Sequence, residues 1–341
     1  METAEFKYYK FICFTDAGCE LIKRTVAALC ENEDVDEEVI VSKVNDLKDW
    51  TASNFQKGNT LVFIGAMGIA VRAIAPFVKD KTTDPAVIVI DEKGHYVIPV
   101  LSGHIGGGVE YSKRLAEIVS GEAVITTATD VEGLFAVDVF AKDHDMVISD
   151  MKKAKEFSAG LLRNKTATYY VDEYFEEYLK LATISAELRK VHCIGDNPDM
   201  IITPAKTIGK ILQLIPKCLV VGMGCKKGTD TDKLCEFCKE YLEEAGFDIR
   251  SVKAVTSIDI KGKELGLIEL SKRLNAEFVT FSAEKLMEQE GDFSSSDFVK
   301  NITGADNICE RSVMAYGCEK LLIKKRSQDG MTLAVGIKRY E

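Results

Sequence analysis

The most chemically suggestive stretch of this sequence is Leu101–Gly108, which contains four glycines within six positions and one histidine, His104. Glycines leave backbone N–H groups uncovered, and the N–H groups at the start of a helix favour bound anions. His104 can act as a general base or acid near neutral pH. The alternative is a tight turn whose glycines serve packing and whose histidine caps the helix. Because such a turn needs no histidine among its glycines, we favour a functional loop.

A second glycine-bearing turn, Gly65–Arg72, follows a short apolar run and opens an apolar helical stretch that Pro76 ends. It lacks the G-x-G-x-x-G spacing and the later acidic residue of a dinucleotide site, so a nicotinamide cofactor is not expected. Arg72 can hold a carboxylate through two parallel hydrogen bonds. An exposed helical arginine is an equally good interpretation of the same residue.

Hydroxyl and carboxylate groups follow a predicted strand at Thr126–Asp130. Polar residues at the carboxyl end of a strand are well placed to face the crevice of an open α/β sheet, which would make Thr127 and Asp130 part of a site. Threonine and aspartate serve equally well in helix caps and turns. On this segment alone, the structural interpretation is slightly favoured.

The segment Gly222–Thr229 looks like a phosphate-binding loop but is not one, because Thr229 stands where that motif requires lysine. Its amides, with Lys226 and Lys227, still suit a carboxylate. Ser257–Glu264 offers further polar groups at the start of a helix that follows a strand. Cys235 and Cys238 have C-x-x-C spacing, but no second pair accompanies them, so buried helical thiols are favoured over a metal or redox site.

Composition limits the classes of protein that these residues can serve. The chain has 341 residues, 46% of them apolar, and 44 basic against 54 acidic side chains give a formal net charge of −10. Such a chain is not disordered, and it lacks the basic surface of a dedicated nucleic-acid binder. The N-terminus does not resemble a secretory signal, and no apolar run is long enough to span a membrane. Ten scattered cysteines indicate reduced thiols, and we expect a cytoplasmic protein.

The elements that position these residues alternate between strands and helices. This alternation predicts an α/β fold with several layered domains and open, twisted sheets. We expect an N-terminal α/β domain over residues 1–140 that carries the glycine loop, a small middle α/β or linker domain over 141–216, and a C-terminal α/β domain over 217–341. Among the less regular segments, 124–127 and 191–194 are predicted as strands and 171–179 as a helical stripe. Asp329-Gly330 predicts the turn of a closing hairpin.

Several of these segments together resemble the CbiG family. In the N-terminal half the resemblance rests on Gly65–Arg72, Asp84–Val89, Leu101–Gly107 and Thr126–Asp130. In the C-terminal half it rests on Gly222–Cys225, Ser257–Lys261, Glu264, Gly266-Leu267, Ser296–Val299 and Glu310. The chain differs from the family at Gly108-Val109, where members commonly carry Ala-Asn, and at Leu265, where they often carry proline.

The resemblance implies a cobalt-precorrin-5A hydrolase of anaerobic cobalamin biosynthesis. Such an enzyme opens a δ-lactone on a cobalt-containing tetrapyrrole and releases acetaldehyde, which gives cobalt-precorrin-5B. It needs a base for water, donors for an oxyanion and a cradle for the peripheral carboxylates of the macrocycle. The cobalt belongs to the substrate, so no cofactor and no metal site of the protein are expected. Transient contact with neighbouring pathway enzymes is a further expectation.

On this basis we assign His104 as the water-activating base and Asp130 as its orienting partner or an alternative base. The residues expected to bind the substrate are Arg72, Ser102, Gly103, Gly106, Gly107, Thr127, Cys225, Lys226, Lys227, Ser257, Lys261 and Glu264. The same glycine loops would also serve a tetrapyrrole carrier that performs no chemistry. Release of acetaldehyde distinguishes the enzyme from the carrier. A nucleotide-dependent α/β enzyme is disfavoured, because no complete phosphate or dinucleotide motif is present.

Overall fold

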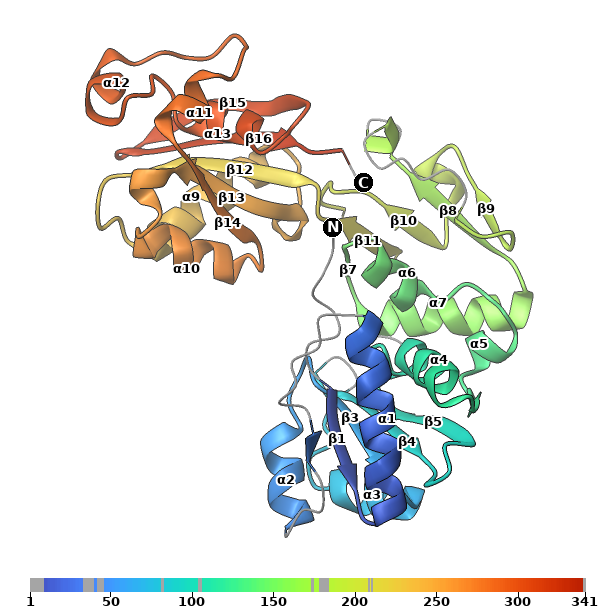
Figure 1. The fold of residues 1–341 in the computed structure, drawn as a ribbon. Coiled ribbons are helices and arrows are strands. Elements are labelled where there is room, and N and C mark those ends of the chain that lie inside the picture. Colours follow the sequence, from blue (N-terminus) through green and yellow to red (C-terminus); the bar gives the residue numbers. More distant parts are fainter. Residues whose placement is uncertain are drawn as a thin grey trace. The chain divides into compact units, whose positions relative to one another are not determined.

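The computed structural model describes residues 9–32, 40–41, 46–80, 83–103, 106–172, 175–177, 184–207, 209 and 211–339. The chain divides into two compact units, Met1–Val139 and Phe140–Glu341. Figure 1 shows the sheets of these units, and the prediction of an α/β fold with several open sheets is confirmed. The division into three domains, with boundaries after residues 140 and 216, stays a prediction. Among the described residues, no helix has both the length and the apolar character that a bilayer crossing requires.

The first unit is built on a six-stranded sheet with the strand order β2-β1-β3-β4-β5-β6. Its strands are β1 (Tyr9–Cys13), β2 (Ile40–Val41), β3 (Thr60–Ile64), β4 (Ala86–Ile90), β5 (Tyr96–Leu101) and β6 (Glu122–Ala123). The first four are parallel, whereas β5 runs antiparallel to β4 and parallel to β6. The almost unbroken apolar runs of β3 and β4 are explained by burial of both sheet faces.

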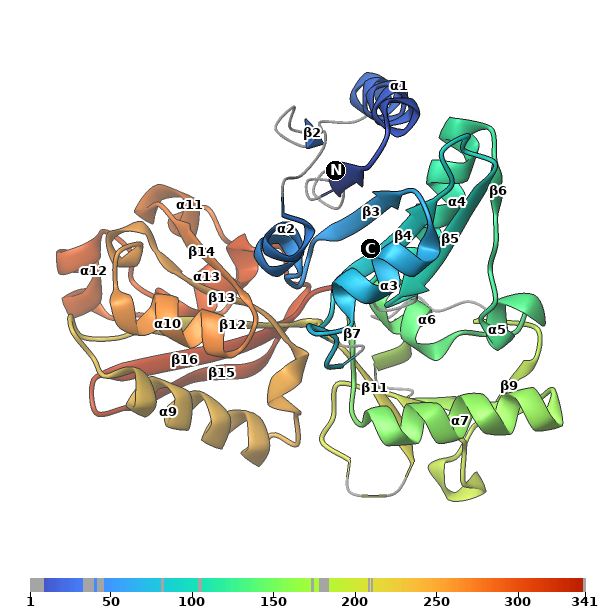
Figure 2. The same cartoon turned by 90° about the horizontal axis from the view of Figure 1, so that it is seen from below.

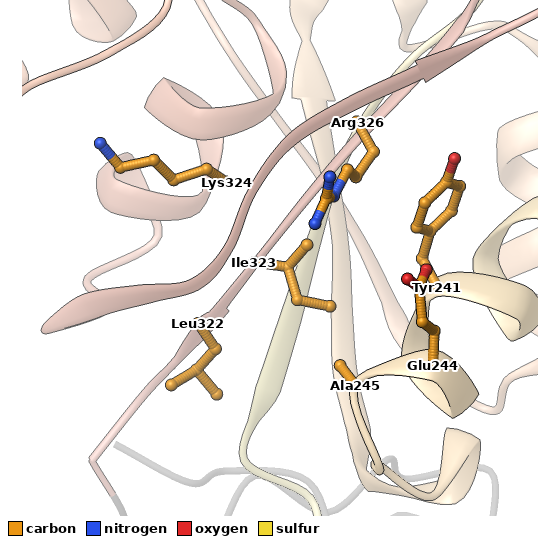
Figure 3. A pocket seen from close by; sticks show the side chains of 7 residues that line it. All are labelled: Tyr241, Glu244, Ala245, Leu322, Ile323, Lys324 and Arg326. Carbon is orange, nitrogen blue, oxygen red and sulfur yellow. The ribbon is translucent and has the colours of Figure 1, made fainter.

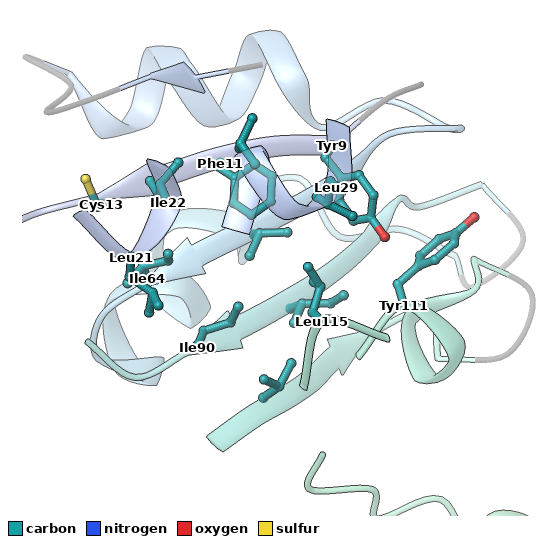
Figure 4. Packing of buried hydrophobic residues seen from close by; sticks show 14 of the residues in the cluster. Tyr9, Phe11, Cys13, Leu21, Ile22, Leu29, Ile64, Ile90, Tyr111 and Leu115 are labelled. Atoms are coloured by element: carbon teal, nitrogen blue, oxygen red, sulfur yellow. The ribbon is translucent and has the colours of Figure 1, made fainter. Parts of the chain in front are cut away.

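Helices cover both faces of this sheet. Helices α1 (Asp16–Asn32) and α4 (Gly108–Val119) pack on one face, where Leu21, Ile22 and Leu115 meet the alternate side chains Phe11, Ile64 and Ile90 (Figure 4). Helices α2 (Leu47–Asn54) and α3 (Met67–Ile74) pack on the other face against the intervening strand residues, among them Phe63 and Val89. Successive side chains of a strand point to opposite faces of the sheet. Each apolar strand therefore contributes alternate residues to two hydrophobic cores, one on each face.

The strand predicted at 124–127 is wrong in its position. Strand β6 covers only Glu122–Ala123, and the Val124 N–H makes the last bond to the neighbouring strand, to the Val97 carbonyl at 2.9 Å. Residues 124–127 then leave the sheet and lead to the short helix α5 (Ala128–Val131), which is followed by α6 (Val137–Asp143).

The second unit begins with a five-stranded sheet ordered β7-β11-β10-β8-β9. It consists of β7 (Met146–Ile148), β8 (Ala167–Val171), β9 (Leu188–Lys190), β10 (Met200–Ile202) and β11 (Leu212–Pro216), with helix α7 (Met151–Asn164) beside it. The strand predicted at 191–194 is wrong in its position: the strand is β9, three residues earlier, and a 3-10 turn follows at Ile194–Asp196. The helical stripe predicted at 171–179 is wrong at Val171, which ends β8. Residues 175–177 are helical, and the stripe positions 174, 178 and 179 lie outside the described residues.

The same unit contains a second five-stranded sheet, ordered β14-β13-β12-β16-β15. Its strands are β12 (Leu219–Gly224), β13 (Val252–Ile258), β14 (Glu277–Phe281), β15 (Lys320–Gln328) and β16 (Met331–Ile337). Helices α9 (Thr231–Glu244) and α10 (Leu265–Arg273) lie on one face and α13 (Cys309–Ala315) on the other (Figures 1 and 2). The short helices α11 (Ala283–Met287) and α12 (Asp297–Thr303) follow β14.

The hairpin predicted at the end of the chain is confirmed. Strands β15 and β16 pair antiparallel, and Asp329 and Gly330 both have positive φ, 53° and 83°. Two central residues with positive φ are typical of the turn that matches the twist of a two-stranded ribbon.

Candidate functional site

The glycine loop between β5 and α4 begins at Ser102, which has the left-handed φ of 53°. Its hydroxyl donates a hydrogen bond to the Asp84 carbonyl oxygen at 3.0 Å, and the residue is buried. A positive φ is uncommon outside glycine, so this conformation is held by the surrounding structure. The Ser102 side chain, predicted to bind substrate, therefore makes its hydrogen bond within the protein.

Two glycines of this loop allow the chain to pass close to itself. A Cβ atom on Gly106 would lie 2.6 Å from the Ser102 Cβ. Gly107 has a φ of 77°, and a Cβ atom there would lie 2.7 Å from the ring of Tyr111. Neither position can carry a side chain without a shift of its neighbours. The packing interpretation of the loop thus holds for both residues.

Two amides at the start of α4 are already bonded to carbonyl groups of the loop. The Gly108 N–H donates to the Ser102 oxygen at 3.2 Å, and the Val109 N–H donates to the Gly103 oxygen at 2.8 Å. These groups are satisfied inside the protein and do not serve a ligand.

The amides of Gly106 and Gly107 differ from those two, because neither has a hydrogen-bond partner in the part of the chain that the structure describes. Gly107 is buried and Gly106 half-buried. A buried N–H group without a partner is rare in proteins, so this pair is the part of the loop that remains suited to an anionic oxygen. His104, the predicted base, lies outside the described residues.

Thr127 and Asp130 lie at the same sheet edge as the glycine loop. Strands β5 and β6 are parallel neighbours, so the chain leaves both at one edge. A Cβ atom on Gly103 would lie 3.9 Å from the Thr127 hydroxyl oxygen, which places these two predicted residues side by side. Thr127 occupies the N-cap of α5 but its side chain makes no capping hydrogen bond, and Asp130 is half-buried within that helix.

Arg72 is not brought together with the glycine loop. The end of β3, Ile64, lies beside Ile90 at the end of β4, whereas Leu101 at the end of β5 pairs with Val87 at the start of β4. The turn that begins at Gly65 and the loop that begins at Ser102 therefore leave opposite edges of the sheet. Helix α3, which carries Arg72, also covers the opposite face from α4.

Arg72 instead lines a groove between α2 and α3. The groove has a volume of about 350 Å³, and it is lined by Leu47, Lys48, Ile69, Arg72, Ala73 and Pro76. Both cations in this set are exposed. A mostly apolar groove with two cations suits a ligand that has an apolar body and carboxylate groups.

The predicted residues of the C-terminal half do come together. Strands β12 and β13 are parallel, and the residues that follow them lie at one sheet edge. We call this set the carboxyl-end cluster, and it comprises Cys225, Lys226, Lys227, Ser257, Lys261 and Glu264. The glycines before it serve packing, since a Cβ atom on Gly222 would lie 1.9 Å from the Cys309 carbonyl oxygen of α13.

Glu264 is the centre of the carboxyl-end cluster. One oxygen of its carboxylate accepts the Gly228 N–H at 2.9 Å, and the other accepts from the Lys261 ammonium at 3.0 Å. The side chains of Glu264 and Lys261 are only 8% and 15% exposed. The amide of this loop, which the sequence predicts to hold a substrate carboxylate, thus holds a carboxylate of the protein itself.

These contacts also determine the charge of Glu264. Burial by itself would raise the pKa of its carboxyl group. The Gly228 amide, the bonded Lys261 ammonium and the nearby charge of Lys227 outweigh burial and hold the pKa below its usual value. Glu264 is therefore an ionised carboxylate at neutral pH.

The other members of the cluster differ in their access to solvent. Burial raises the pKa of the half-buried Cys225 thiol, an effect that the nearby Lys261 opposes. Lys226 is exposed and lies against the hairpin turn, since a Cβ atom on Gly330 would be 2.6 Å from its Cε atom. Ser257 is fully buried and donates to the Met223 carbonyl oxygen at 2.7 Å. Its hydroxyl therefore supports the strand edge from within.

Two exposed apolar residues beside this cluster were not predicted from the sequence. Ile260 is 61% and Leu265 is 78% exposed, and they flank the Lys261–Glu264 ion pair in the chain. Leu265 is the first residue of α10, a position that proline favours, which explains why a proline there would fit. The sequence does not show whether an apolar residue at the start of a helix is buried or exposed. Only the folded structure shows that Leu265 is exposed to solvent.

Both cysteines of the C-x-x-C pair lie on helix α9, as predicted, but Cys235 is only half-buried. Cys238 is fully buried, and burial raises the pKa of its thiol to about 12. Cys235 accepts a long hydrogen bond from Arg273 at 3.9 Å. No group of three or more His, Cys, Asp or Glu side chains among the described residues is arranged to hold a metal ion.

A further pocket of about 210 Å³ lies between the end of α9 and the edge strand β15 (Figure 3). Its lining is Tyr241, Glu244, Ala245, Leu322, Ile323, Lys324 and Arg326. It contains none of the residues that the sequence singled out.

Known proteins are similar to this chain in both of its halves and over its whole length. Residues 49–130 match the family model described as cobalamin synthesis G N-terminal, and residues 219–336 match cobalamin synthesis G C-terminus. The chain is 31% identical to the cobalt-precorrin-5A hydrolase of Salmonella typhimurium over 353 aligned residues, which cover 99% of each chain. It is 32% identical to the enzyme of that name from Priestia megaterium, over 85% of this chain and 81% of the relative.

A solved structure is also similar to this chain. The crystal structure of a putative cobalamin biosynthesis protein G homolog from Sulfolobus solfataricus covers 98% of both chains, with 20% sequence identity and a TM-score of 0.41.

Proposed function

The chain belongs to the CbiG family, and we propose on that premise that it is a cobalt-precorrin-5A hydrolase. It opens the δ-lactone of its substrate and releases acetaldehyde, giving cobalt-precorrin-5B in anaerobic cobalamin biosynthesis. The observation that carries this proposal is the alignment with the Salmonella typhimurium enzyme, which is 31% identical over 99% of both chains. The two family models, matched in the same order along the chain, support it.

The lactone-opening step needs a base and oxyanion donors, and we assign both to the first unit. The amides of Gly106 and Gly107 are the proposed donors to the tetrahedral oxyanion, where one such donor is typically worth about 3 kcal/mol of barrier. His104 is the proposed base that removes a proton from water, and Asp130 orients it or replaces it in that role. Gly103 and Thr127, which lie side by side, are proposed to bind the substrate beside these groups.

Binding of the macrocycle needs cations for its carboxylates and an apolar surface for its body. We assign the carboxylate contacts to the exposed Lys226 and Lys227, with Lys261 beside them, and not to Arg72, which lies at the opposite sheet edge from the glycine loop. Ile260 and Leu265 supply exposed apolar area next to the lysines.

Three of the remaining predicted binding residues, Glu264, Ser102 and Ser257, support the site without direct contact. Glu264 fixes Gly228 and Lys261 through its two carboxylate oxygens. Ser102 and Ser257 direct their hydroxyls to carbonyl groups of the protein. Cys225 is half-buried beside Lys261, and we propose that its thiol borders the bound substrate.

The cobalt ion is part of the proposed substrate, and no resident cofactor is proposed. Location in the cytoplasm and transient contact with neighbouring pathway enzymes are further proposals, which rest on the composition of the chain and on the reactivity of corrinoid intermediates.

The direct test is anaerobic incubation of the purified protein with cobalt-precorrin-5A. We expect one acetaldehyde for each substrate molecule and a product whose mass equals that of the substrate plus one water minus one acetaldehyde. Binding of the substrate without acetaldehyde would identify a carrier and refute the enzyme. We expect His104→Ala to fold normally and lose acetaldehyde release, while His95→Ala, at an exposed position, keeps it. A near-full rate for His104→Ala would remove His104 from the mechanism.

The carboxylate contacts are tested separately. We expect Lys227→Ala to raise KM with little change in kcat, because its charge contributes to binding and not to the reacting bond. The control is Lys272→Ala, which removes an equally positive side chain, 69% exposed, from the far end of α10. Equal KM values for the two variants would exclude Lys227 from the site.

A further inference from the structure

Two cysteines of the first unit have their sulfur atoms in contact. Cys13 is the last residue of β1, and Cys19 lies in the first turn of α1. Their Sγ atoms are 2.7 Å apart. A disulfide bond is about 2.05 Å long, so the two sulfurs need to approach by only about 0.7 Å more to be bonded.

The local backbone holds the two thiols in this position. A Cβ atom on Gly18 would lie 3.0 Å from the Cys13 Cβ and 3.3 Å from a methyl carbon of Ile64, so glycine allows the helix to start close to the sheet. The Gly18 N–H donates to the Thr15 hydroxyl at 3.1 Å, and the Cys19 N–H donates to the Thr15 carbonyl at 3.0 Å. The first turn of α1 is thus fastened to the residues that follow β1.

The two thiols differ in access. Cys13 is fully buried, whereas Cys19 is half-buried. A reagent in solution therefore reaches Cys19 first, and Cys13 is placed directly behind it. This is the arrangement of an attacking thiol and a resolving thiol.

We propose that Cys13 and Cys19 are a dithiol site that closes reversibly to a disulfide when a small-molecule disulfide is the oxidant. The Cys19 thiolate attacks one sulfur of the oxidant, which forms a mixed disulfide and expels one small thiol. Cys13 then loses its proton and attacks the Cys19 sulfur, which forms the internal disulfide and expels the second small thiol. The protein loses two electrons and two protons, and the oxidant, which gains them, becomes two thiols.

The C-x-x-C pair of α9 offers a contrast within the same chain. The C-x-x-C spacing is the better-known redox pattern, but Cys238 is fully buried and the Cys235 sulfur accepts a hydrogen bond from Arg273. The pair with the less familiar spacing is the one whose sulfurs meet, because a strand end and a helix start converge there.

The experiment uses the full chain with the exposed Cys30 and Cys193 replaced by serine, so that neither competes for the oxidant. The reduced protein is treated with oxidised glutathione, and its intact mass and peptide map are recorded. We expect the loss of two hydrogen atoms, a disulfide between the peptides of Cys13 and Cys19, and full recovery of both thiols with dithiothreitol. Retention of all thiols, or a disulfide between other cysteines, would overturn the proposal.

The variant Cys13→Ser separates the two steps. Without the resolving thiol, we expect Cys19 to retain one glutathione, as seen by mass. The parent protein should show no such adduct at the end of the reaction. A stable adduct on the parent would contradict closure by Cys13. The matched control is Cys235→Ser, which alters neither result. These readouts do not involve turnover, so they are independent of the proposed hydrolase activity.

Discussion

Glu264 accepts the backbone N–H of Gly228 at 2.9 Å, across 36 residues of sequence. This hydrogen bond joins the loop after β12 to the loop after β13. Together with the Lys261 ion pair, it makes the carboxyl-end cluster one connected structure. The two loops that carry the lysines proposed to bind substrate are therefore held in fixed positions relative to each other.

We expect Glu264→Gln to lower stability and weaken substrate binding. The amide oxygen can still accept from Gly228, but Lys261 loses its charged partner while it is only 15% exposed. Hydrogen bonds to charged groups contribute about 1.5–3 kcal/mol, and we expect a loss of that size in the free energy of unfolding. Chemical denaturation measures it. The control is Glu269→Gln, whose carboxylate is 48% exposed and should change stability little. Equal stabilities of the two variants would contradict the assigned role.

The same carboxylate predicts how stability depends on pH. The folded-state pKa of Glu264 lies below its usual value, so its contribution is present above the unfolded-state pKa and is lost as pH falls through the folded-state pKa. We therefore expect the stability difference between the wild type and Glu264→Gln to be largest near neutral pH and to shrink below about pH 4. Denaturant titrations of both proteins over this range provide the test. A difference that grew on acidification would show that the sign is wrong.

Two glycine substitutions in the first unit should have opposite effects. At Gly107, alanine would adopt a left-handed conformation that costs about 1–2 kcal/mol, and its Cβ would be 2.7 Å from the Tyr111 ring. We expect Gly107→Ala to lower the melting temperature and acetaldehyde release. Gly68 is the second residue of α3, with nothing within 4 Å of the added Cβ, so Gly68→Ala should stabilise the protein by up to about 0.5 kcal/mol, less than in a helix interior. Equal melting temperatures would refute the packing analysis.

Glu310 is a structural carboxylate, although the family resemblance includes it. It is fully buried and accepts hydrogen bonds from the Ser294 N–H and hydroxyl, the Asn307 amide and the Lys325 N–H. In Glu310→Gln, an amide group would face these donors, and we expect the free energy of unfolding to fall by about 1.5–3 kcal/mol. Turnover per folded molecule should stay close to the wild-type value. Loss of turnover at full stability would assign Glu310 to the chemistry.

Much of the fold could be predicted because it depends on local pattern. The hairpin turn at Asp329-Gly330 and the glycine start of α4 both rest on neighbouring residues and are confirmed. The strand predicted at 124–127 failed although the neighbouring strand β5 continues to Leu101. After Val97 accepts the Val124 N–H, the next donor of β5 along this ladder would be Pro99, which has no N–H. The pattern of residues 124–127 does not record which residue lies opposite them.

The sequence by itself determined the family, the α/β class and the clustering of Cys225, Lys226, Lys227, Lys261 and Glu264, since parallel strands bring their carboxyl ends to one edge. Only the tertiary structure decided what those groups do. It showed that Glu264 already occupies the Gly228 amide, that Arg72 and the glycine loop leave opposite sheet edges, and that Cys13 meets Cys19. The reason is physical. The spacing of residues along the sequence determines which of them follow neighbouring strands and so lie at one edge of the sheet. Hydrogen bonds and close contacts form between groups that are far apart in the sequence, and only the folded chain brings those groups together.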